Sequence, residues 1–246
     1  MPGLSSPAPD LWLIHGNLQT PAVWKAFVPR FLAAGLKVHL VDLYATLADS
    51  MEAWAEAFTT SVRVAGEPHA RVVLGYSLGA RLALHALLAD PTLWNGAILV
   101  GADTGLADEE ARVRRRETDA VWARRFLEEP IDRVMEDWNA QPVFGGRPAL
   151  CHDHTVPRER QPIARMFTAY SKGRQRDLLP DLGRTIDVPT LWLTGADDPV
   201  FTRSAQSAVA AIPGARHEII PGAAHRVPWE NPNAFLEAVI TCAIPP

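Results

Sequence analysis

The sequence predicts an α/β protein whose central sheet is mostly parallel and carries helices on both faces. Short apolar runs alternate with helical patterns in the first third of the chain, and the alternation resumes after residue 182. Strands that alternate with helices form parallel sheets covered on both faces. From 105 to 182 the sequence is charged and mostly helical. We therefore expect a core formed by residues 1–104 and 183–246, and a helical insertion, 105–182, that covers it as a lid.

The individual elements follow from hydrophobic spacing and turn residues. Within the insertion, apolar side chains at i, i+3, i+4 and i+7 predict one helix around Ile131–Trp138. Strands are expected at Leu11–Gly16, Leu36–Leu43, Arg71–Ser77, Gly96–Asp103, Pro189–Asp198 and Arg216–His225, and core helices at Trp24–Leu32, Met51–Val64, Leu78–Ala89 and 232–240.

Composition excludes several classes of function. The net charge of −4 argues against a nucleic-acid-binding surface, and the two cysteines form no CxxC pair that would indicate a disulfide scaffold or thiol metal site. No cationic leader or membrane-length apolar run is present, so we expect a cytoplasmic protein that binds no membrane. His152 and His154 in "CHDH" are expected to form a loop, and the chemistry below requires neither metal nor cofactor.

The stretch "GYSLG" places Ser77 between two glycines, directly after a predicted strand and before a predicted helix. In a G-x-S-x-G turn the flanking glycines prevent a steric clash, and the serine oxygen rises above the sheet at the positive end of the helix. The alternative is an ordinary glycine-rich turn. The context favours a reactive serine.

A reactive serine needs a histidine that takes its proton and an acid that orients the histidine. His225 follows a late predicted strand, and Asp198 follows the strand before it, with Asp197 as the alternative acid. The order serine, acid, histidine is the one expected on this type of sheet. Oxyanion donors should be the backbone N–H groups of Leu78, after the serine, and Asn17, after the first strand.

These motifs resemble the α/β-hydrolase fold, which hosts esterases, C–C hydrolases and lyases, so the fold alone does not define the reaction. Arg81 discriminates among them because it lies four residues after Ser77, on the same helix face. A guanidinium keeps its charge and needs an anion. That anion is either a buried carboxylate of the protein or a carboxylate of the substrate.

The segments "GYSLGARLAL", "RRRETDAVWARRF", "DWNAQPVF", "GADDPVF" and "GAAH" resemble the 2-succinyl-6-hydroxy-2,4-cyclohexadiene-1-carboxylate synthases of menaquinone biosynthesis. The resemblance implies Ser77, Asp198 and His225 as the triad and Arg81 as a carboxylate anchor. It also implies that Arg115, Trp138 and Tyr76 bind the substrate. A further arginine of that family, near the end of the lid, falls at about Tyr170 in this sequence.

In that family the reaction is an elimination: a ring proton is removed, pyruvate leaves, and the ring rearranges to a diene. The resemblance therefore implies a carbon–oxygen lyase with a small anionic substrate, in which serine acts as the base and no cofactor takes part. Two alternatives are a serine hydrolase that cleaves esters or C–C bonds of an acidic substrate, and an inactive hydrolase-fold protein that only binds a ligand.

Overall fold

A six-stranded sheet, in the order β2-β1-β3-β4-β5-β6 with every pairing parallel, forms the centre of the computed structural model. The model describes residues 8–65, 69–148 and 159–244. This architecture confirms the predicted α/β fold class. The strands are β1 (Asp10–Ile14), β2 (Lys37–Val41), β3 (Arg71–Tyr76), β4 (Gly96–Val100), β5 (Thr190–Gly195) and β6 (Arg216–Ile220).

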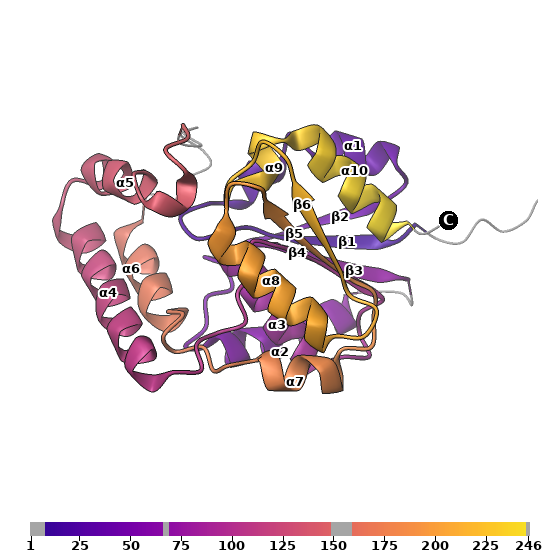
Figure 1. Cartoon of the computed structure of the whole chain (residues 1–246), viewed down its shortest axis with the longest axis horizontal. Helices are drawn as coiled ribbons and strands as arrows, with labels where there is room; N and C mark the ends of the chain where they lie inside the picture. Colours follow the sequence, from indigo (N-terminus) through magenta and orange to yellow (C-terminus); the bar gives the residue numbers. More distant parts are fainter. Residues whose placement is uncertain (1–7, 66–68, 149–158, 245–246) are drawn as a thin grey trace, which may run out of the picture.

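Side chains alternate between the two faces of the sheet, as the strand period of two residues requires. On β3, Val72, Leu74 and Tyr76 belong to the apolar cluster beneath α1 (Val28–Ala33), α9 (Val227–Glu230) and α10 (Pro232–Ala243), whereas Val73 belongs to the cluster on the opposite face. Figure 1 shows the two layers of helices on either side of the sheet. The opposite layer contains α2 (Met51–Val64), α3 (Leu78–Ala89), α7 (Leu179–Thr185) and α8 (Pro199–Ala211).

Most predicted core elements match the structure, and α2 and α3 have the bounds expected from the sequence. The helix predicted at Trp24–Leu32 differs, because it divides into the 3₁₀ helix η1 (Pro21–Trp24) and α1. Pro29 explains the division: it has no backbone N–H and fits only in the first turn of a helix, which is where α1 holds it.

The described part of the insertion is helical. Its helices α4, α5 and α6 lie beyond one end of the sheet, where α4 packs against α6 (Figure 1). Buried residues of this lid, including Phe126, Val134 and Phe167, form an apolar cluster that also contains Leu18 from the core. The helices are α4 (Glu109–Glu128), α5 (Ile131–Asn139), η2 (Pro142–Phe144) and α6 (Arg160–Ala169). Leu182, the last residue of the predicted insertion, lies in α7 and packs in the core cluster. The boundary between insertion and core at residue 182 therefore stays a prediction.

No helix in the described part of the chain has both the length and the apolar character needed to cross a bilayer. His152 and His154 lie in 149–158, outside the described residues. Elsewhere in the described ranges, no group of three or more His, Cys, Asp or Glu side chains could hold a metal ion.

We predict that Gly79→Ala destabilises the fold. In most helices alanine is favoured over glycine by about 1 kcal/mol, but a Cβ at Gly79 would lie 2.3 Å from the carbonyl oxygen of Ile14 and 2.5 Å from that of His15. Overpacking against fixed backbone should lower the free energy of unfolding by about 2 kcal/mol, measured by urea denaturation. Gly96→Ala is the control, because its nearest atom would be 3.5 Å away. Equal stabilities of the two variants would contradict the prediction.

Candidate active site

Ser77 lies in a strained turn between β3 and α3. Its φ of 54° falls in the left-handed region that side chains rarely adopt. A Cβ on Gly75 would lie 2.3 Å from the carbonyl oxygen of Gly79, so the turn closes only with glycine at position 75. The glycine at position 75 therefore has the steric reason expected from the G-x-S-x-G pattern.

One chain of hydrogen bonds joins the serine, the histidine and one of the two candidate acids. His225 Nδ1–H donates to Asp198 Oδ2 over 2.9 Å, and Ser77 Oγ–H donates to His225 Nε2 over 3.0 Å. This proton assignment follows because a carboxylate can only accept, which leaves Nε2 of a neutral imidazole as the acceptor. Asp197 instead pairs with Arg147 at the surface. Asp198 is buried and also accepts from the backbone N–H of Phe201.

The imidazole of His225 is fixed by its packing as well as by its hydrogen bonds. Phe201 and Tyr76 lie against it, with ring centroids 4.3 Å and 5.5 Å away. A Cβ on Gly101 would be 2.7 Å from His225 Cε1, so the glycine that directly follows β4 makes room for the ring. Tyr76 is buried, and burial raises the pKa of its hydroxyl well above the ordinary value. Tyr76 therefore stays neutral beside the histidine.

The loop after β1 presents the second predicted oxyanion donor. Gly16 N–H donates to Gln19 Oε1 at 2.9 Å, and Leu18 N–H donates to Asn17 Oδ1 at 3.0 Å. Among the described residues no acceptor is recorded for the N–H between them, that of Asn17. Leu78 is the first residue of α3, where backbone N–H groups have no partner within the helix. Asn17 and Leu78 both line the cavity that contains Ser77.

His15 ties this loop to the next strand. It is fully buried, its Nδ1–H donates to the Gly16 carbonyl at 2.9 Å, and its Nε2 accepts from Leu43 N–H at 3.2 Å. Burial lowers the pKa of His15 to about 4. The neutral imidazole thus holds the loop after β1 against the segment that follows β2.

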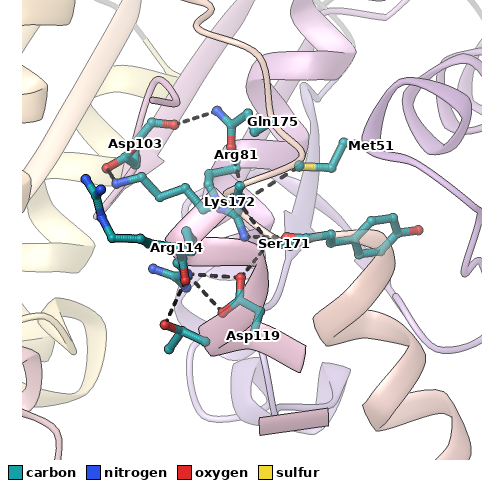
Figure 2. A network of polar contacts seen from close by, with 12 residues as sticks. Met51, Arg81, Asp103, Arg114, Asp119, Ser171, Lys172 and Gln175 are labelled. Atoms are coloured by element: carbon teal, nitrogen blue, oxygen red, sulfur yellow. Dashed lines mark hydrogen bonds and ion pairs between the residues drawn. The ribbon is translucent and has the colours of Figure 1, made fainter. Parts of the chain in front are cut away.

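Arg81 reaches the segment that follows α6 rather than a carboxylate. Its Nη1 donates to Gln175 Oε1 at 3.1 Å (Figure 2). Its Nη2 donates to the Tyr170 carbonyl at 2.9 Å. Within the described ranges no carboxylate forms an ion pair with it. Burial, and next the positive charge of Arg115, lower the pKa of Arg81 to about 10. The guanidinium is charged at neutral pH, and its hydrogen-bond partners are neutral.

The two predicted lid residues also line the cavity. Arg115, on α4, donates from Nε to both oxygens of Asp119, at 2.9 and 3.0 Å, and Asp119 is buried. Trp138, on α5, packs edge-on against Trp122 and Phe167, at ring-centroid distances of 5.2 Å and 5.3 Å. Other arginines of the lid helix, such as Arg114, form exposed ion pairs on its solvated face.

The cavity has a volume of about 490 Å³ and lies between the core and the lid. It is lined by every site residue predicted from the sequence. These include Asp197, the alternative acid, whose carboxylate pairs with Arg147 and not with His225. Sequence reasoning missed Lys172 and Asp103, which form an ion pair on its wall, and Gln175, which holds Arg81. The only signal for Lys172 was its position two residues after Tyr170, where a family arginine was expected.

A comparison with protein families identifies the class. The model described as the alpha/beta hydrolase family matches residues 13–238. The chain therefore belongs to the α/β hydrolase family and is an enzyme of that fold.

The chain is also similar to individual proteins of known name. The chain is 34% identical to the 2-succinyl-6-hydroxy-2,4-cyclohexadiene-1-carboxylate synthase of Serratia proteamaculans, covering 91% of this chain and 89% of the relative. It is 30% identical to the synthase of Pectobacterium atrosepticum, with coverages of 94% and 92%. The solved structure of MenH from S. aureus superimposes with a TM-score of 0.86 at 20% identity, covering 97% and 94%, and at this identity shows the fold alone. The predicted resemblance to the synthases is confirmed.

We predict that His15 makes the protein acid-sensitive between pH 6.5 and 4. In this window the unfolded chain binds a proton that folded His15, with its pKa of about 4, does not bind, so stability falls as the pH falls. The loss should reach about 3 kcal/mol.

The measurement is urea denaturation of the wild type and of His15→Gln at several pH values. His85, whose burial also lowers its pKa to about 4, contributes in both proteins, so the difference between the two profiles isolates His15. Parallel profiles would refute the assignment.

Proposed function

We propose that this enzyme is a cytoplasmic carbon–oxygen lyase of menaquinone biosynthesis. It eliminates pyruvate from an enolpyruvyl-bearing cyclohexene carboxylate and yields 2-succinyl-6-hydroxy-2,4-cyclohexadiene-1-carboxylate. The observation that carries the proposal is the charge of Arg81, which has only neutral partners in the described chain and lies one helical turn from the serine–histidine–aspartate relay. The named relatives, aligned over about nine-tenths of the chain, support the same reaction.

In the proposed mechanism Ser77 is the base. Its hydroxyl proton passes to His225, and the oxygen takes the ring proton of the substrate. The electron pair of the broken C–H bond enters the ring, the double bond shifts, and the C–O bond to the enolpyruvyl group breaks. The leaving enolate takes up a proton and becomes pyruvate, so no water is consumed. The backbone N–H groups of Asn17 and Leu78 stabilise the negative charge that develops on oxygen.

The charge of the substrate explains the cations of the cavity. By its name the product carries a ring carboxylate and a succinyl carboxylate, and pyruvate leaves with a third. Two of the guanidinium groups that line the cavity, those of Arg81 and Arg115, can bind such carboxylates, because the acceptors recorded for each among the described residues do not occupy all of its N–H donors. Tyr76 and Trp138 contribute apolar walls for the ring. None of these steps needs a cofactor.

We predict that the purified protein releases pyruvate from the enolpyruvyl substrate, as followed by a coupled lactate dehydrogenase assay. Ser77→Ala and His225→Ala should each lower kcat by about 10³-fold, since a positioned general base contributes up to about that factor. Ser207→Ala is the control, because its hydroxyl bonds to the carbonyl of Arg203 on the exposed side of α8. Brisk hydrolysis of p-nitrophenyl esters without pyruvate release would favour a serine hydrolase instead.

We also predict that Arg81→Met lowers kcat/KM by about 10- to 100-fold, the value of a charge-assisted hydrogen bond to a carboxylate. Arg81→Lys should recover part of this loss because it keeps the charge. The melting temperature of each variant is measured as well, because a loss of stability from the broken contact between Arg81 and Tyr170 would lower it, whereas a loss of substrate binding alone would not. Arg63→Met, which removes an exposed ion pair with Asp90, is the matched control. Wild-type kinetics in Arg81→Met would exclude Arg81 as an anchor.

A further inference from the structure

Besides Arg81 and Arg115, a lysine lies on the cavity wall and has no role in the mechanism above. Lys172 follows α6, and its side chain lines the cavity with only 19% of its surface exposed. Its ammonium pairs with the carboxylate of Asp103, whose side chain is 8% exposed and also lines the cavity. An ion pair removed from water is a weak source of stability. Its position on a substrate cavity therefore indicates a role in binding.

The contacts around this pair connect it to Arg81. Asp103 Oδ1 accepts a hydrogen bond from Gly105 N–H at 2.9 Å, which fixes the carboxylate in the loop that follows β4. Its backbone carbonyl accepts from Gln175 Nε2 at 3.0 Å, and Gln175 Oε1 accepts from Arg81 Nη1 at 3.1 Å. Gln175 is completely buried. Figure 2 shows Lys172 and Arg81 joined through Asp103 and Gln175. The two cations are thus held in one rigid network.

The ammonium of Lys172 has three N–H donors. Asp103 is its one recorded acceptor within the described parts of the chain. Arg115 is arranged in the same way, because Asp119 binds its Nε and leaves both terminal nitrogens without a recorded acceptor among the described residues. In each pair the aspartate orients the cation and leaves donors for a ligand.

We propose that Lys172 binds a second carboxylate of the substrate, separate from the one bound by Arg81. The inference rests on the proposed function and extends it, because it makes the enzyme selective for a dicarboxylate ring substrate over a monocarboxylate. Asp103 is then a positioning residue whose own charge partly opposes the incoming anion.

The test is binding, measured by titration calorimetry on the full chain without turnover. The probes are 2-succinylbenzoate, which carries two carboxylates, and 2-butanoylbenzoate, in which a methyl group replaces the terminal carboxylate. Lys172→Met should weaken binding of the dicarboxylate by about 10-fold and that of the monocarboxylate by less than about twofold. Lys172→Arg should restore the affinity for the dicarboxylate. The control is Lys37→Met, which breaks a lysine–aspartate pair with Asp10 on the sheet.

Asp103→Asn separates this role from a structural one. Asparagine keeps the acceptor for Gly105 N–H but removes the competing charge. If the ion pair were purely structural, Asp103→Asn and Lys172→Met would remove the same contact, and the two variants would weaken binding equally. A substrate-binding Lys172 predicts opposite signs: Asp103→Asn tightens dicarboxylate binding, whereas Lys172→Met weakens it.

Three results would overturn the inference: a wild type without preference for the dicarboxylate, equal losses for both probes in Lys172→Met, or equal losses in Lys172→Met and Asp103→Asn. Pyruvate release is scored separately. Selective binding through Lys172 without pyruvate release would contradict the lyase and leave the inference standing. Pyruvate release with unchanged dicarboxylate binding in Lys172→Met would contradict the inference alone.

Discussion

The arrangement of the cavity depends on a positive charge, that of Arg81, which is removed from bulk water and has no carboxylate in an ion pair with it among the described residues. A guanidinium cannot lose its proton at neutral pH, so the desolvation of Arg81 has to be offset by hydrogen bonds. Gln175 and the Tyr170 carbonyl provide them with neutral oxygens. A carboxylate in their place would have satisfied the charge permanently. The neutral acceptors hold the group in position and leave the field of the cation directed at the cavity.

The same contacts couple the lid to the core. Arg81 lies on α3, one turn beyond the strained serine, and it also contacts Met51 Sδ on α2. Its two oxygen acceptors, on Gln175 and Tyr170, belong to the segment that returns from the lid. Ser171, in that segment, donates to Asp119 on α4 at 2.7 Å. Asp119 in turn orients Arg115. One continuous group of polar contacts therefore joins α3, which follows Ser77, to the lid cation Arg115.

Local rules made the core predictable from the sequence. The glycines around Ser77 have no alternative residue for steric reasons, and the order of Ser77, Asp198 and His225 follows from where parallel strands end. The choice between Asp197 and Asp198 needed coordinates, because neighbouring residues after a strand differ only in side-chain direction. Lys172 and Asp103 were missed for another reason. They are 69 residues apart and meet only through tertiary packing of the lid return on β4, which no local pattern encodes.

The sheet and the lid contribute different parts of the candidate site. The hydrogen-bonded serine, histidine and aspartate, the loop after β1 and the strained turn depend on the sheet. In the proposed function they supply proton transfer and charge stabilisation without selecting a substrate. Of the cations that line this cavity, Arg81 lies on α3, Arg226 precedes α9, and Arg115 and Lys172 lie in the lid, each with its own aspartate. Around Arg81, Arg115 and Lys172 the two aspartates leave a net charge of +1. Under the proposed function, an anion with more than one carboxylate gains most when it shares Lys172 and Arg115 with their aspartates, and a single carboxylate is bound by Arg81 alone.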